Sequence, residues 1–199
     1  MAHGLVGHRV QIQDPPIAQF LFSDTRLAWL WLILRLYTGY EWLTAGYEKI
    51  INPAWFGAKA GTSIAGFAAG ALQKTGGAHP SVFGWYAWFL QNLVIPNAAV
   101  WSYLITIGET AVGLGLIFGC LTGFAAFFGG MMNANYLLAG TVSSNPLLFI
   151  FATWLVLAWK VAGYYGIDHY LLPSLGVPGK PGKLFGERRM ERGTNPATV

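Results

Sequence analysis

The chain has 199 residues, of which 54% are hydrophobic and 16% aromatic, while only 10% carry a charge. An ordinary soluble domain carries about a quarter charged residues, so this composition excludes a typical water-soluble protein and points to a lipid bilayer as the solvent. The formal charge of +4 includes a cluster of cations in the last 20 residues, next to an apolar block and not spread over a folded face. The sequence therefore predicts a membrane flank and no nucleic-acid partner.

Residue types that commonly bind cofactors are few in this chain, and they lie outside the apolar blocks. Cys120 is the only cysteine, so the chain alone can form neither an internal disulfide nor an all-cysteine iron–sulfur cluster. The histidines are His3, His8, His79 and His169, and all lie outside the apolar blocks. We therefore expect no haem, iron–sulfur or metal centre in this chain, and we expect any electron carrier to be a lipid-soluble quinone or to belong to a partner.

The first apolar block covers residues 27–47 and follows Ser23-Asp24, a pair that can cap a helix N-terminus. Residues 49–96 are more polar and rich in glycine, which predicts an extracytoplasmic cap that contains a short interfacial helix begun by Trp55 and Phe56. The aromatic segment at residues 81–95 is too short to cross a bilayer and predicts a second helix in the interface.

Three further apolar blocks follow, at about residues 97–119, 121–140 and 146–167. Each is close to the length of about 20 residues that a bilayer requires. The fold predicted for residues 27–172 is therefore an all-α integral membrane protein, a bundle of four transmembrane helices with the cap between the first and the second.

The orientation follows from the positions of Lys and Arg beside these blocks. The N-terminal segment, residues 1–26, and the tail, residues 173–199, together hold more cations than the cap. We expect both termini to be cytoplasmic in a multi-pass protein of the inner or plasma membrane.

Charged residues inside the apolar blocks are functional candidates, because a charge in the bilayer is costly and needs a partner. At a rise of about 1.5 Å per residue, Arg35 lies about 12 Å and Glu109 about 15 Å from the cytoplasmic side, if the start of the first block and the end of the second lie at one level. We therefore predict an Arg35–Glu109 ion pair, which either clasps two helices or forms a binding or catalytic site.

Further polar residues extend this candidate site. Lys49 continues the helical stripe of Arg35, whereas Glu41 points elsewhere and needs a partner at its own depth. The third block offers Asn133, Asn135 and Tyr136 at about that depth. Polar residues of this kind also join helices without any further role.

Two motifs carry a resemblance to a known family. Residues 34–49, LRLYTGYEWLTAGYEK, contain an arginine, two glycines and a closing lysine, and residues 108–119, GETAVGLGLIFG, contain a Gly-Glu pair followed by spaced glycines. Both resemble the first-helix and second-helix motifs of the DoxX family, over about residues 27–172. The resemblance implies a four-helix membrane protein in which Arg35, Lys49 and Glu109 match the polar positions.

The resemblance also sets the expected function. DoxD-type members are the membrane subunit of a thiosulfate:quinone oxidoreductase and act with a second subunit, so we expect protein partners in a quinone-linked redox complex. Two alternatives stay open. One is a non-catalytic scaffold of a larger respiratory or photosynthetic membrane complex, and the other is a carrier for a small anion with Arg35 as its binding charge.

Overall fold

The computed structural model describes residues 14–177. The greater part of the basic tail and the first half of the N-terminal segment lie outside these residues, as do most of the cations on which the expected orientation depends. Within the described residues the chain is entirely helical, with no strand, which confirms the all-α expectation.

Nine α-helices occur in the described part of the chain, together with one 3-10 turn and one π-helical turn. They are α1 (Pro16–Ser23), η1 (Thr25–Leu27), α2 (Ala28–Ile50), α3 (Thr62–Leu72), α4 (Gly84–Phe89), η2 (Leu90–Val94), α5 (Ala98–Phe118), α6 (Thr122–Leu138), α7 (Asn145–Leu157), α8 (Trp159–Ala162) and α9 (Asp168–Ser174).

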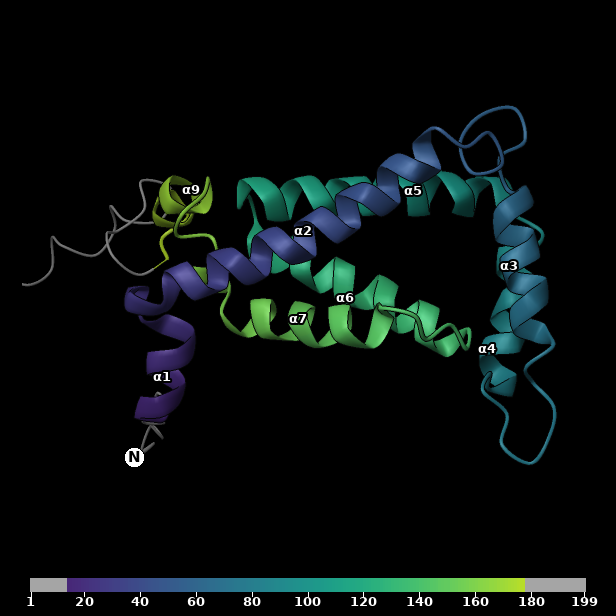
Figure 1. The fold of residues 1–199 in the computed structure, drawn as a ribbon, viewed down its shortest axis with the longest axis horizontal. Coiled ribbons are helices and arrows are strands. Elements are labelled where there is room, and N and C mark those ends of the chain that lie inside the picture. Colours follow the sequence, from purple (N-terminus) through teal and green to yellow (C-terminus); the bar gives the residue numbers. More distant parts are fainter. Residues whose placement is uncertain (1–13, 178–199) are drawn as a thin grey trace, which may run out of the picture.

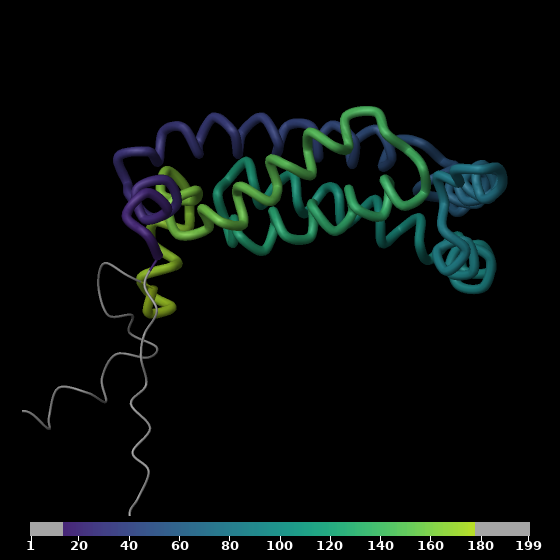
Figure 2. The backbone as a smooth tube through the Cα atoms, turned by 90° about the horizontal axis from the view of Figure 1, so that it is seen from below, coloured from purple at the N-terminus to yellow at the C-terminus, as the bar shows by residue number. Residues whose placement is uncertain are grey.

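The four longest helices, α2, α5, α6 and α7, lie side by side along the long axis of the molecule (Figure 1). In chain order α5 packs on α2, α6 on α5 and α7 on α6, and α7 also contacts α2, so the four helices close a ring. The ring surrounds a core that includes Trp42, Leu116 and Leu155. Helices α1 and α9 lie at one end of it and α3 and α4 at the other (Figures 1 and 2).

Helices α2 and α5 pack closely because glycines remove the side chains between them. A Cβ on Gly113 of α5 would lie 2.5 Å from the backbone nitrogen of Leu43, and one on Gly46 of α2 would lie 2.8 Å from the backbone nitrogen of Thr110. No real Cβ tolerates such distances, so backbone contact depends on glycine at both positions. These contacts also fix the antiparallel register of the two helices.

The cap is a small packed layer and not a loose loop. Ile64, Ala68 and Tyr86 belong to a separate buried cluster formed by α3, α4 and η2. The cap is fastened to the long helices by polar contacts: Lys74 Nζ donates to Gly140 O at the C-terminal end of α6 (2.8 Å). A cation is favoured there because unpaired carbonyls give a helix C-terminus partial negative charge.

The turn from α5 to α6 spans only three residues, and the segment after α8 holds it in place. Gly119 ends α5 in the left-handed conformation (φ 63°), which suits glycine. The backbone nitrogens of Ile167 and Asp168 then donate to the carbonyls of Phe118 and Gly119, at 3.1 and 2.8 Å. This pairing anchors the start of α9 to the α5–α6 turn.

Four single spans were expected, and by length and composition one described helix, α5, suffices to cross a membrane by itself. A second is obtained if α1 and the η1–α2 segment, which are bent by 49° at their junction, count as one span. Residues 146–167, expected as one span, are divided: α7 ends after 13 residues and α8 follows as a separate turn of 4.

Candidate functional site

Glu109 is the centre of a buried polar network near the cap end of the long helices. Its side chain on α5 is 1% exposed, and it lies 2.7 Å from Lys49 Nζ at the end of α2 through Oε2. Its other oxygen, Oε1, accepts a hydrogen bond of 2.6 Å from the Tyr136 hydroxyl on α6. Lys49 Nζ and Glu109 Oε2 are close enough for an ion pair, but their angles are not those of a hydrogen bond. Three helices thus contribute one side chain each.

Lys49 connects this network to the surroundings. Its side chain keeps 18% of its surface exposed, whereas that of Glu109 is closed off. The ammonium also lies 5.1 Å from the ring centre of Trp55, a distance at which a cation is attracted to an aromatic face. The network therefore runs from a partly exposed amine through a buried carboxylate to a phenol.

The predicted Arg35–Glu109 ion pair is wrong. The Arg35 side chain is 1% exposed, and its Nη2 donates to Tyr165 O at 3.0 Å, in the segment before α9. The guanidinium packs against Gly119, where a Cβ would overlap it. Its position at the C-terminal end of α5 favours a positive charge.

The prediction failed because the start of α2 and the end of α5 do not lie at one level. Gly119, at the end of α5, lies beside Arg35, about 8 residues or 12 Å into the first apolar block. The first turns of α2 therefore extend beyond α5. Since Gly46 contacts Thr110, Glu109 lies near the far end of α2, about 11 residues or 16 Å along the axis from Arg35.

Asp168 completes a second polar cluster around Arg35. No ion pair within 4 Å joins its carboxylate to the Arg35 guanidinium in the described part of the chain. Asp168 is 2% exposed and accepts hydrogen bonds from the backbone nitrogens of Leu121 (2.7 Å) and Thr122 (2.8 Å), which caps the N-terminus of α6. Both charges of this cluster are thus stabilised by helix ends.

The remaining predicted site residues do not gather around Glu41. Asn135 accepts a hydrogen bond from Tyr86 of the cap, through its backbone oxygen (3.0 Å) and Oδ1 (3.2 Å). Burial raises the pKa of Tyr86 to about 12, so this phenol stays protonated in any physiological medium. Asn133 is fully buried without a hydrogen-bond partner among the described residues, and Glu41 is half-buried with none either.

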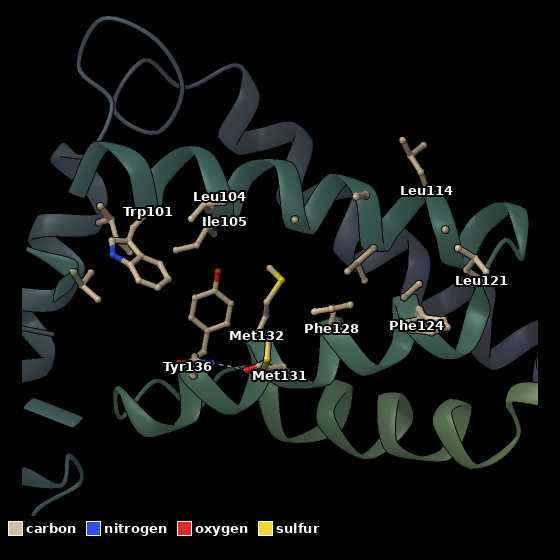
Figure 3. A pocket seen from close by; sticks show the side chains of 18 of the residues that line it. Trp101, Leu104, Ile105, Leu114, Leu121, Phe124, Phe128, Met131, Met132 and Tyr136 are labelled. Atoms are coloured by element: carbon tan, nitrogen blue, oxygen red, sulfur yellow. Dashed lines mark hydrogen bonds between the residues drawn. The ribbon is translucent and has the colours of Figure 1, made fainter. Parts of the chain in front are cut away.

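A long groove of about 960 Å³ runs between α5 and α6 and ends under the cap (Figure 3). It exists because Gly108, Ala111 and Gly115 recur along one face of α5 and leave no large side chains to fill the space. Tyr136 stands in the groove and points from α6 toward Ile105 of α5 (Figure 3). The polar network and the groove therefore share Tyr136.

Asp168, Tyr86 and the groove were not predicted from the sequence. Asp168 follows an apolar block, where a solvated residue at a helix end is the ordinary interpretation, and only the fold brings it to another helix's N-terminus. Tyr86 lies in an aromatic segment without a charge to single it out. The spaced glycines were visible, but their pattern predicts close helix packing as readily as an open groove.

Comparison with protein-family models, with curated proteins and with solved structures gives no match to this chain.

Proposed function

We propose that this chain is an integral membrane protein and the membrane subunit of a quinone-linked redox complex. The observation that carries the membrane assignment is the inverted polarity of the long helices. Arg35, Glu109 and Asn133 are almost fully buried, whereas large apolar side chains face outward on all four long helices. The exposed side chains include Trp29, Ile33 and Tyr40 of α2, Val100, Leu104 and Ile107 of α5, Phe124 and Phe127 of α6, and Ile150, Trp154 and Leu157 of α7.

Helix dimensions support a four-helix membrane bundle. At about 1.5 Å per residue, α5 with 21 residues and α2 with 23 reach about 31 and 34 Å, and a hydrocarbon core is about 30 Å thick. Helix α6, with 17 residues, is slightly shorter. Helices α7 and α8 together form the fourth span, interrupted where the helix breaks at Ala158. The helices at the two ends lie across the long axis and occupy the interfaces (Figure 1).

The Lys49–Glu109–Tyr136 network supports the redox assignment. Burying a carboxylate between an amine and a phenol inside a bundle costs free energy. Charges in membrane spans commonly serve ligand or proton pathways. Two of the three matching polar positions in the DoxX resemblance, Lys49 and Glu109, form its ion pair. The proposed complex oxidises a small reduced substrate, thiosulfate in the DoxD-type case, and passes the electrons to quinone through its partner subunits.

A scaffold function has one observation in its favour. Phe83, Trp85 and Trp88 at the cap are 55–62% exposed, which is unusual for rings of this size outside an interface. The anion carrier is not favoured, because the Arg35 guanidinium packs against Gly119 and Gly166 and donates a hydrogen bond to Tyr165 O, where an anion would have to bind.

The test has two stages. Washing membranes with alkaline carbonate should leave the protein in the pellet, and release into the wash would contradict the membrane assignment. Protein purified in mild detergent, with the partners that it retains, should then reduce decylubiquinone with thiosulfate, and Glu109→Gln should lose this activity while the exposed neighbour Glu48→Gln keeps it. No turnover together with retention in a larger respiratory complex would favour the scaffold.

A further inference from the structure

We propose that the groove between α5 and α6 is the binding site of one long-chain quinone, with its ring under the cap and its chain along the two helices. The inference rests on the proposed membrane function, because such a molecule reaches the groove from the bilayer. It assigns to the quinone a position, an orientation and the residues that form its site.

The lining of the groove selects an uncharged occupant. Within the described residues, the side chains that line it include no Asp, Glu, Lys, Arg or His. A phospholipid phosphate or a fatty-acid carboxylate would therefore enter without a cation to pair with it, at a large cost in a medium of low dielectric constant. A quinone carries only carbonyl and ether oxygens, so its transfer into the groove costs far less.

The two ends of the groove differ in a way that fits a ring and a chain. Aromatic rings crowd the cap end, where Phe67 lies edge-on to Tyr136 (5.9 Å between centres) and Phe89 edge-on to Trp101 (5.6 Å). Planar rings pack favourably among such side chains. Figure 3 shows Phe124 and Leu121 at the opposite end, beyond Phe128. Among the residues that the structure describes, no edge-on pair joins two of the lining rings at this end, and its leucine and phenylalanine side chains give apolar contacts for an isoprenoid chain.

The polar network meets the groove at the ring end. Tyr136 lines the groove, and its hydroxyl donates to Glu109 Oε1 at 2.6 Å. A ring placed there would lie beside a titratable side chain of the network, whereas at the Phe124 end Asp168 bonds only the backbone nitrogen of the lining residue Leu121. The stretch from Trp101 to Phe118 also gives the groove about 25 Å of helix, enough for an extended chain of several isoprene units.

The experiment uses a 1,4-benzoquinone that carries a photoreactive azide on the ring and a ten-carbon chain, with decylubiquinone as competitor. Irradiation of the purified full-length protein, followed by peptide mass spectrometry, should place the competed label on residues 62–72, 86–101 or 131–136. Label confined to residues 114–128 would overturn the orientation.

Two groove variants test the site itself. Ala111→Trp and Leu104→Trp fill the groove from positions that line it and are exposed, so they need no rearrangement of the core. The matched control is Ile107→Trp, which lies on the same helix, is 59% exposed and does not line the groove. Competed labelling should vanish in both groove variants and persist in the control, with melting temperatures and elution profiles reporting that all three fold.

The other outcomes separate this inference from the proposed function. Equal labelling of wild type and groove variants would overturn the groove as the site and leave quinone binding by the chain intact. A phospholipid retained by wild type and lost from Ala111→Trp in native mass spectrometry, without quinone label, would overturn the choice of occupant. No competed label in wild type, in a protein that stays in carbonate-washed membranes, would contradict the quinone link itself.

Discussion

The two ends of the four-helix ring bury charges in different ways. At the end near α9, Arg35 and Asp168 are held by helix termini and by backbone groups of the α5–α6 turn. At the cap end, Lys49, Glu109 and Tyr136 are held by one another, beside a groove that nothing in the described chain fills. The first arrangement fastens helices together, whereas the second keeps a titratable network against a ligand-sized space. We propose that the first end is structural and that the second forms the functional site.

The largest expected effect is at the cap end. Glu109→Gln removes the carboxylate and leaves the Lys49 ammonium without its partner in a mostly buried position. Breaking a buried pair in this way typically costs about 3–5 kcal/mol. We expect a marked fall in the melting temperature in detergent, measured by the loss of helical circular dichroism. Glu48 is exposed and precedes Lys49 in the chain. The unfolding free energy of Glu48→Gln should therefore stay within about 0.5 kcal/mol of wild type. Equal melting of both variants would mean that the ion pair does not form.

A somewhat smaller loss is expected at the opposite end from Gly119→Ala. A left-handed residue with a Cβ costs about 1–2 kcal/mol, and the methyl group would also overlap the Arg35 guanidinium, which adds about 1–3 kcal/mol. Gly77→Ala is the matched control, because Gly77 also has a positive φ (91°) but nothing within 4 Å of the added Cβ. Chemical unfolding of both variants should separate the cost of the left-handed backbone conformation from the cost of overlap with the guanidinium. If they lose equal stability, the guanidinium does not pack where we place it.

Asp168→Ala should have the smallest effect of the three, because no ion pair within 4 Å joins Asp168 to Arg35 among the described residues and the guanidinium keeps its bond to Tyr165 O. It removes the carboxylate that accepts from the backbone nitrogens of Leu121 and Thr122 at the start of α6, and the loss of a helix cap costs about 0.5–2 kcal/mol. Asp24→Ala provides the comparison, since that carboxylate is partly exposed and bonds only Arg26. Hydrogen exchange should speed up at Leu121 and Thr122 in Asp168→Ala alone. Unchanged protection there would show that the α6 N-terminus is capped in another way.

The fold was more predictable from the sequence than the site. Hydrophobic block lengths located the helices that became α2, α5 and α6, and the interruptions placed α3 and α4 between them. The pairing of Arg35 was not predictable, because it depends on how far α2 extends past the end of α5, and a sequence read in isolation contains no common reference level for two helices. The Gly46–Thr110 contact supplies that level, and it is a property of packing.

A double-mutant cycle between Lys49 and Glu109 tests the division into two ends most directly. We predict that Lys49→Met and Glu109→Gln are coupled by about 0.5–3 kcal/mol in unfolding free energy, so that the double variant is more stable than the sum of the single losses implies. Arg35→Met and Glu109→Gln, separated by about 11 residues along the helix axis, should be additive within about 0.5 kcal/mol. Coupling of Glu109 to Arg35 without coupling to Lys49 would contradict the account.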